Sequence, residues 1–564
     1  MARHLDSLPR LRRGAAAALF MLVAGPWGAA ASPWLYGIHF YGDPAASHAE
    51  QMSGGKPLWS LECVLTDSDV WWGAVWQRDN RFNHMRARGH TIIARIQPQW
   101  GYAVPREPTY TMSDYLAKVQ AAAYELRNVC HIWQVGNEMN LFAEYGGGVL
   151  SASEYVNKFK QIRAAIKSVT SPLGPQIVLL GPVSPGPPAG GVRHTDGNVY
   201  LAQMCAALTS ADLDGFSIHA YGAPWLGAAD ARKDLQAGYI SQLCIVDHYG
   251  FSHLPVYMTE WNRATNPNSA ADEAQTARFL HGAFADLAAW NQRPRAHPIG
   301  AACWFIYAYD SVTWAQYSIE YLRTVNPPGP NNDLFDAFAF AAASNYPSVS
   351  PPPGGIPPRM TGGVPPGVNV ALTATATADS ALTPASRAID GVISAGSKWT
   401  SDAVTPLHWL QLDLGSIRAV SGFVVYHAGA GGESTSYNTQ CFMFETAPTA
   451  GGPWTIEGSF WNQLNFTART LLAPRFVRHV RLFIADPGID NHARIPEFQV
   501  YAVTPGDLDQ DGDRDLADAA AFQRCFTGAG GGPTGAGCLA AQFDEDGDVD
   551  AQDWASFGAA LAGP

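Results

Sequence analysis

The sequence lacks several features that would point to common classes of protein. Lys and Arg number 36 against 49 Asp and Glu, and no basic patch stands out, so neither nucleic acid nor an anionic membrane surface is an expected partner. No GxGxxG loop follows the first expected strand, which leaves a dinucleotide-binding fold without support. The eight Cys show no metal-ligand spacing.

Long apolar runs are also lacking after the N-terminus, so no later segment predicts a membrane span. An Arg-rich start precedes the apolar run 14–30, and the small residues before Ser32 suit cleavage. Residues 1–31 therefore predict a signal peptide, with a retained N-terminal anchor as the alternative. The mature protein is expected to be secreted, extracellular or associated with the cell surface.

Export would place the Cys in an oxidising compartment. Cys525 and Cys538 lie close together in a small C-terminal segment, which predicts a disulfide. Five further Cys fall in the N-terminal part, so at least one of them is expected to be unpaired within it: Cys63, Cys130, Cys205, Cys244 and Cys303.

Eight apolar runs alternate with helical patterns between residues 34 and 343. Continuous apolar runs are typical of strands buried on both faces, and the alternation predicts parallel strands with right-handed crossovers. We expect a closed (β/α)₈ barrel, or TIM barrel, over residues 32–343, with an open doubly wound sheet as the alternative. The expected strands are 35–41, 58–64, 91–97, 131–137, 177–183, 213–219, 255–260 and 300–307. The expected helices are 68–88, 113–129, 151–170, 197–210, 230–249, 272–292 and 331–343.

The composition changes after the barrel. Residues 344–366 are rich in Pro and Gly and predict a semi-rigid linker that does not pack. Residues 367–503 combine short alternating strands with many turns, which predicts an all-β jelly-roll sandwich. Residues 506–564 hold twelve acids and two bases in two Asp-rich loops, each before a short helical stretch, and predict a small α-helical module that binds cations.

Two carboxylates stand where expected strands end. Glu138 closes the run 131–138 and Glu260 closes the run 255–260. The carboxyl ends of the strands build the active site of a (β/α)₈ barrel. A retaining glycosidase needs one acid to protonate the leaving oxygen and a second carboxylate to attack the anomeric carbon. We expect this pair to face each other, the alternative being that both are salt-bridged rim residues.

The runs Gly-Asn-Glu at 136–138 and Thr-Glu-Trp at 259–261 resemble the ends of strands 4 and 7 in clan A of the glycoside hydrolases. The resemblance covers roughly residues 34–343. It implies that Glu138 is the general acid/base, that Glu260 is the nucleophile and that Asn137 bonds the sugar 2-hydroxyl.

Other rim residues are candidates for substrate binding. The resemblance implies that a Tyr or His at the end of the sixth strand, here His219 or Tyr221, contacts the nucleophile. Trp304 is expected as the platform under the scissile sugar, with a core position as its alternative. The remaining candidates are His39, Arg95, Trp100 and Trp261, and Arg95 has pairing with Glu62 as its alternative.

Residues 367–503 resemble the coagulation factor V/VIII C-type (discoidin) domain, which includes family 32 carbohydrate-binding modules. The matching residues are Ala-Ile-Asp-Gly at 388–391, Trp399, and the runs 409–415 and 496–501. The resemblance implies a glycan-targeting sandwich. It also implies a structural calcium ion between Asp390 and Glu497, for which the alternative is a plain turn Asp and a surface Glu.

The C-terminal loops follow the spacing of calcium loops. The first starts at Asp507 and has Gly512 at the sharp turn, and the second starts at the neutral Gln542 and is expected to bind more weakly. This duplication resembles a type I dockerin, which implies docking onto a cohesin-type scaffold protein. The expected Ca²⁺ ligands are Asp507, Asp509, Asp511, Asp513, Asp515, Asp518, Asp544, Asp546, Asp548, Asp550 and Asp553.

Together these features predict a secreted, modular, retaining glycoside hydrolase for β-linked polysaccharide or oligosaccharide. No cofactor is expected for catalysis, and the Ca²⁺ ions are structural. The alternatives are a non-catalytic glycan-binding protein and a calcium-dependent adhesion protein built on a barrel scaffold.

Overall fold

The computed structural model describes residues 31–42, 47–67, 81–222, 228–263, 265–266, 269–307, 312–325, 334–462, 464–509, 511, 513–532, 535–544 and 546–561. All but the last residue of the expected signal peptide lies outside this range. The first part of the expected helix 68–88 lies outside it too.

The N-terminal part is a closed barrel of eight parallel strands, in which each strand pairs with its sequence neighbour and β1 with β8. This confirms the predicted barrel and excludes the open sheet. Every strand is an apolar run buried along almost its whole length. The strands are β1 (Tyr36–His39), β2 (Trp59–Leu65), β3 (Thr91–Gln97), β4 (Ile132–Val135), β5 (Ile177–Leu180), β6 (Gly215–Gly222), β7 (Val256–Arg263) and β8 (Ile299–Trp304).

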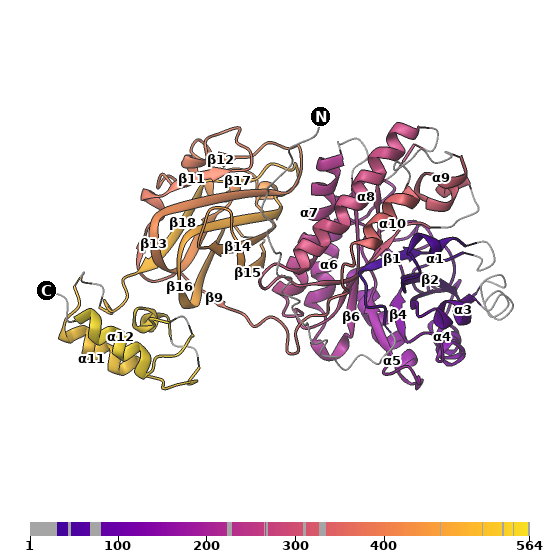
Figure 1. Cartoon of the computed structure of the whole chain (residues 1–564), viewed down its shortest axis with the longest axis horizontal. Helices are drawn as coiled ribbons and strands as arrows, with labels where there is room; N and C mark the ends of the chain where they lie inside the picture. Colours follow the sequence, from indigo (N-terminus) through magenta and orange to yellow (C-terminus); the bar gives the residue numbers. More distant parts are fainter. Residues whose placement is uncertain are drawn as a thin grey trace, which may run out of the picture.

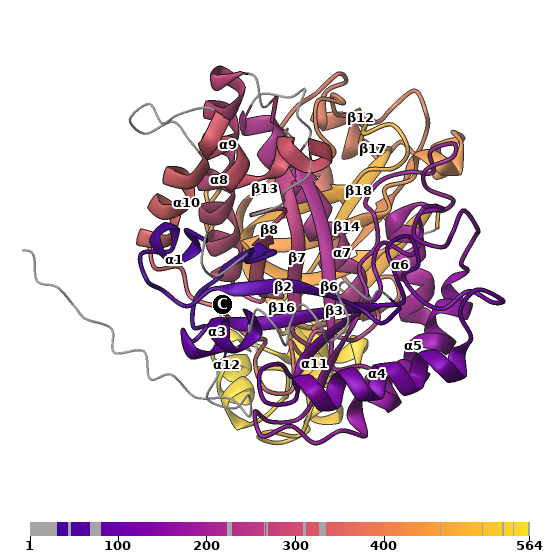
Figure 2. The same cartoon turned by 90° about the vertical axis from the view of Figure 1, so that its right-hand side faces the viewer.

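Helices surround these strands, with α8, α9 and α10 on one side and α4, α5 and α6 on the other (Figure 2). Several begin where a side chain caps the first turn: Thr111, Ser151, Asp196 and Ser269 each accept a backbone N–H three residues later. The helices are α1 (Ala49–Met52), α3 (Arg81–Ala87), α4 (Met112–Leu126), α5 (Ala152–Lys167), α6 (Gly197–Ala206), α7 (Ala228–His248), α8 (Ala270–Asn291), α9 (Ile319–Val325) and α10 (Leu334–Ala343). The short 3₁₀ turns η1 (Ser210–Asp212) and η2 (Val312–Tyr317) complete this part, and η2 and α9 were not predicted.

The Pro- and Gly-rich segment 344–366 packs against both neighbours, which corrects the prediction of a semi-rigid linker that does not pack. Its Tyr346 carbonyl accepts the N–H of Leu35 at 3.0 Å, and the N–H of Ile356 donates to Ser252 at 3.0 Å. Its last part forms strand β9 (Met360–Gly362), which pairs with β16 of the sandwich. Pro and Gly content indicates only that a segment disfavours a long regular helix or strand. It does not show whether the backbone N–H and C=O groups of the segment bond to the barrel and the sandwich, as they do here.

The sandwich follows with its main sheet in the order β10-β18-β13-β16-β14-β15, and β11 and β9 add at its sides. Its core includes Phe423, Phe444 and Phe498, which contact one another. The strands are β10 (Val368–Asn369), β11 (Thr375–Ala378), β12 (Trp399–Thr400), β13 (His408–Tyr426), β14 (Cys441–Ala447), β15 (Thr455–Trp461), β16 (Phe466–Asp486), β17 (Arg494–Ile495) and β18 (Glu497–Val503). The 3₁₀ turns are η3 (Ala371–Thr373), η4 (Ala385–Ala388), η5 (Ala428–Gly431) and η6 (Thr435–Tyr437).

The barrel and the sandwich share one apolar cluster. Helix α7 packs against β14, β15 and β16, and Met443, Ile456 and Trp461 of the sandwich belong to the same buried cluster as the barrel core (Figure 1). A disulfide joins Cys244 of α7 to Cys441 of β14. The unpaired Cys expected within the barrel is thus partnered from another domain.

The C-terminal module packs α11 (Leu516–Cys525) against α12 (Ala551–Leu561), with η7 (Ala536–Ala541) between them in sequence. Phe522 and Phe557 form its small core with ring centroids 5.1 Å apart. The predicted Cys525–Cys538 disulfide is present. In the described part of the chain, no helix is both long and apolar enough to cross a lipid bilayer.

We expect peptide mapping under non-reducing conditions to recover Cys244 linked to Cys441. The four Cys that the structure leaves free, Cys63, Cys130, Cys205 and Cys303, should be alkylated only after denaturation, because all are buried. Replacing the pair in Cys244→Ser/Cys441→Ser should lower the free energy of unfolding by about 2–4 kcal/mol, because a bridge over a long loop restricts the unfolded chain. Recovery of Cys244 as a free thiol would contradict the assignment.

Candidate active site and cation loops

The turn after β4 aims Glu138 into the barrel mouth. Gly136 has φ +73°, and a Cβ there would lie 2.7 Å from the carbonyl oxygen of Ala103, so the turn requires Gly. Glu138 itself has φ +37°, a left-handed conformation that costs energy for a residue with a side chain. Strain of this kind gathers at functional sites.

One hydroxyl lies between the two glutamates. The Tyr221 hydroxyl lies 3.3 Å from Glu138 and 3.1 Å from Glu260, so its single proton can be donated to either carboxylate, and His219 lies 3.0 Å from Glu138. A bulge in the β6–β7 pairing brings His219 opposite Glu260. The two carboxyl groups therefore approach one common atom in the barrel mouth.

Arg95 fixes one side of the pair. Its Nη1 donates to Glu260 Oε1 at 2.8 Å and to Asn137 Oδ1 at 3.0 Å. His39 Nδ1 lies 3.5 Å from the same Glu260 oxygen. Glu62 instead accepts the N–H of Tyr41, at 2.7 Å, so the scaffold alternative of an Arg95–Glu62 pair is not what the structure shows.

Burial dominates the proton affinities of the site. It raises the pKa of Glu138 to about 7, and it also raises the pKa of Glu260, although the charge of Arg95 acts to lower the pKa of Glu260. Only Glu260 has a direct ion pair with a guanidinium, so the negative charge of the pair is favoured there. Burial also lowers the pKa of His219 to about 4, which leaves that ring neutral at pH 7. Burial thus favours the protonated form of Glu138, and the ion pair favours the ionised form of Glu260.

These groups line a cavity of about 810 Å³, which we call the catalytic cavity. Of the candidates, Trp100 stands at its rim with 41% of its surface exposed and lies 5.2 Å from the Arg95 guanidinium. The other candidates that line it are His39, Arg95, Asn137, Glu138, Tyr221 and Glu260.

Trp261 and Trp304 do not line the catalytic cavity, which corrects their expected role as sugar platforms. Both are fully buried and pack edge to face with ring centroids 5.0 Å apart. Side chains alternate along a strand, so Glu260 points into the barrel and Trp261 points outward toward the helices. Cys303, one residue before Trp304, takes the inward position on β8. His219 is also fully buried and acts on the site through its bond to Glu138.

Several residues of the cavity were not predicted. Glu144 accepts a hydrogen bond from Asn137 at 3.1 Å, and burial raises its pKa to about 7. Phe305 and Trp314 contact each other edge to face on the other wall. Glu144 follows β4, and Phe305 and Trp314 follow β8, so their place in the sequence marks all three as residues of the barrel rim. Their approach to the two glutamates depends on the conformation of the loops, which the sequence pattern does not show. Also unpredicted are Phe40, Leu141, Arg193, Asn262 and Tyr317.

The two Asp-rich loops of the C-terminal module repeat each other bond by bond. Asp518 accepts the N–H groups of Leu508 at 2.6 Å and Asp515 at 2.9 Å. Asp553 accepts the corresponding groups of Phe543 and Asp550 at 2.6 and 3.0 Å. The duplication read from the sequence is therefore also a duplication of conformation.

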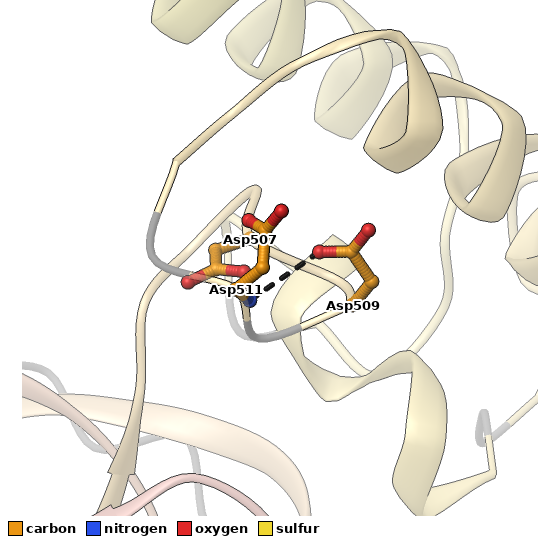
Figure 3. A group of neighbouring side chains, drawn as sticks. All are labelled: Asp507, Asp509 and Asp511. Atoms are coloured by element: carbon orange, nitrogen blue, oxygen red, sulfur yellow. Dashed lines mark hydrogen bonds between the residues drawn. The ribbon is translucent and has the colours of Figure 1, made fainter.

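Within each loop the acids gather in two groups of three whose oxygens lie within 4.8 Å of one another. Figure 3 shows one group, in which the Asp511 N–H donates to Asp509 at 3.4 Å. One buried carboxylate oxygen of Asp507 and one of Asp548 have no hydrogen-bond partner, which suits oxygen atoms that coordinate a cation. The groups are Asp507–Asp509–Asp511, Asp513–Asp515–Asp518, Asp544–Asp546–Asp553 and Asp548–Asp550–Asp553.

Of the sandwich pair, Glu497 suits a cation, whereas Asp390 is an exposed turn residue whose carboxylate accepts the Val392 N–H at 2.9 Å, as its alternative stated. Glu497 Oε2 accepts the Gly391 N–H at 3.2 Å, while its other oxygen is buried without a partner. Burial and the neighbouring Asp390 raise the pKa of Glu497 to about 7. The plain surface Glu of the alternative is excluded, because Glu497 is fully buried.

Residues 371–492 match the F5/8 type C domain family. No curated protein matches the chain. Among solved structures, a chitosan-binding module of a chitosanase/glucanase from Paenibacillus sp. IK-5 is 26% identical and covers 24% of this chain and 99% of its own, with a TM-score of 0.21. The family 32 carbohydrate-binding module of Streptococcus pneumoniae EndoD is 26% identical over 24% of this chain and 100% of its own, also at 0.21. That of C. perfringens NanJ, solved with galactose, is 23% identical over 24% and 97%, again at 0.21.

The raised pKa of Glu138 predicts a pH-dependent difference in stability between the wild type and Glu138→Gln. Folding lifts this pKa from its ordinary 4.5 to about 7, so the folded state holds the proton more tightly than the unfolded state between these values. The wild type should therefore lose unfolding free energy relative to the neutral variant as pH rises from about 4.5 to about 7, by on the order of 3 kcal/mol. Urea unfolding across this range measures it.

The matched control is Glu125→Gln, at an exposed position on α4. A difference for Glu138→Gln that stays constant from pH 4.5 to 7 would contradict the raised pKa of Glu138.

Proposed function

We propose that this protein is an exported glycoside hydrolase that cleaves β-linked glycans with retention of configuration. The observation that carries the proposal is the single Tyr221 hydroxyl within hydrogen-bond reach of both Glu138 and Glu260. This shared contact supports a close pair of the retaining type, because both carboxyl groups approach one atom in the same cavity.

The two glutamates differ in the way the reaction requires. Glu138, with its pKa near 7, donates its proton to the leaving glycosidic oxygen. Glu260, paired with Arg95, attacks the anomeric carbon and forms a glycosyl-enzyme. Glu138, now ionised, then takes a proton from water as that water displaces the sugar from Glu260. Asn137 is placed by Arg95 to bond a hydroxyl next to the reacting carbon.

The sandwich and the C-terminal module fit supporting roles. The F5/8 type C match supports a binding function for the sandwich, which we take to be glycan targeting. Asp390 with Glu497 and the duplicated Asp loops would hold structural Ca²⁺, since a hard cation prefers carboxylate oxygen. The resemblance to a type I dockerin supports attachment to a cohesin-type scaffold protein.

A second candidate function is a non-catalytic glycan-binding or calcium-dependent adhesion protein. The sandwich match favours it, because that module needs no chemistry from the barrel. A panel of chromogenic β-glycosides and β-linked polysaccharides separates the two functions, since an adhesion protein would turn over none of them.

Glu260→Ala should abolish turnover, and added azide should restore it by forming a glycosyl azide in the space of the lost carboxylate. Glu138→Ala should lower hydrolysis of glycosides with poor leaving groups by about 10²–10⁴-fold, and that of activated aryl glycosides much less, because only poor leaving groups need the proton. Glu125→Ala serves as the distant control. Unchanged turnover in Glu260→Ala would remove Glu260 from the mechanism.

Calcium titration of the full chain should reveal sites that Asp518→Asn and Asp553→Asn each remove in part, because each Asp closes one of the two loops. Chelation should expose residues 506–561 to protease, while the barrel and the sandwich stay resistant. Asp114→Asn, at an exposed position on α4, should behave as the wild type. Equal calcium uptake by all four proteins would refute the loops as binding sites.

A further inference from the structure

A second cavity, of about 630 Å³, lies between the barrel and the sandwich. We call it the interdomain groove. The barrel contributes the loop after β5, the start of α6 and one face of α7. The sandwich contributes residues from its loops and from the end of β16, among them Gln440, Asp486 and Ile489. Neither domain forms this groove alone.

The groove adjoins the catalytic cavity. Pro185, Tyr221 and Gly222 line both cavities. Because the Tyr221 hydroxyl contacts both glutamates, the shared boundary lies beside the place where the bond would be cleaved. A chain held at the glutamates would need to pass only these three residues to reach the groove.

The sandwich wall of the groove is held in place. Asn198 at the start of α6 donates to Asp486 at the end of β16 at 2.8 Å, directly within the groove. The Cys244–Cys441 disulfide and the shared apolar cluster fix two neighbouring elements, α7 and β14. The sandwich residues of the groove are thus held at a fixed position relative to the barrel.

The charge of the groove selects the kind of sugar. Three carboxylates line it, from Asp196, Asp234 and Asp486, and none of its described lining residues is Lys, Arg or His. The remaining polar groups are amides and hydroxyls, which suit sugar hydroxyls. Anionic sugars would meet like charge, whereas neutral or amino sugars would not. Ile489, with 63% of its surface exposed, adds an apolar contact at the sandwich edge.

The volumes of the two cavities indicate how long a bound oligosaccharide can be. Each cavity by itself has the size of one ordinary ligand site, about 300–1,000 Å³. A disaccharide at the glutamates would leave the groove empty, whereas a longer oligosaccharide would fill both cavities.

We propose that the interdomain groove binds the part of a glycan that extends from the cleaved bond toward the sandwich. The substrate is then a chain of several neutral or amino sugars, and the sandwich supplies the distal sugar contacts. This inference rests on the proposed hydrolase function for its kinetic test, but the binding of long chains can be measured without it.

The experiment compares the double variant Gln440→Ala/Ile489→Ala with Ile417→Ala, a matched isoleucine on β13 that is 67% exposed and does not line the groove. The probes are β-1,4-linked glucose, glucosamine and glucuronate oligomers from dimer to octamer. In the Glu260→Ala background, calorimetry should show affinity for the glucose or glucosamine series that rises with length beyond the trimer. The groove variant should lose about tenfold of the octamer affinity and none of the dimer affinity, while Ile417→Ala changes neither.

In the active enzyme, kcat/KM for the long oligomers should fall by a similar factor in the groove variant and stay unchanged for the shortest substrate. The affinity could rise with oligomer length and fall in the groove variant while the protein with Glu260 intact turns over none of the oligomers. That result would refute the proposed hydrolase function and support the proposed role of the groove. Affinity that does not rise beyond the trimer, equal loss for short and long oligomers, or preferred binding of the glucuronate octamer would overturn the groove proposal whether or not turnover occurs.

Discussion

The contact between Arg95 and Glu260 is the interaction on which the site depends. Both groups are buried in the barrel mouth, where an unpaired charge would be costly, and each satisfies the other at 2.8 Å. The same guanidinium orients Asn137, while Tyr221 connects Glu260 to Glu138. One cation thus favours the ionised form of Glu260, while burial favours the protonated form of Glu138.

The barrel and the sandwich form one packed body around this site. Helix α7 belongs to the barrel by sequence but buries its outer face against β14, β15 and β16. The packing explains why Cys244 pairs outside the barrel, and why the segment 344–366 lies against both domains. It also places the sandwich beside the cavity at the barrel mouth, with residues of both domains lining the interdomain groove.

The sequence was most informative where local pattern and structure share a cause. Strands buried on both faces are mostly apolar, so all eight barrel strands could be predicted close to their observed positions. Glu138 follows the end of β4 as predicted, whereas β7 continues past Glu260 to Arg263, so Glu260 lies within its strand and does not close it. The repeat of Asp and Gly in the tail predicted the repeated loop conformation, because each loop is built from contacts within about ten residues.

The sequence by itself determined the order of the modules, the closed barrel and the two glutamates at its mouth. Only the tertiary structure decided that Trp261 and Trp304 face outward, that Glu144 and Trp314 reach the cavity, and that Cys244 meets Cys441. The physical reason is the distance along the sequence between the residues that contact each other. Strand burial and loop spacing are set by neighbouring residues, whereas these contacts depend on how distant elements pack, which no local pattern records.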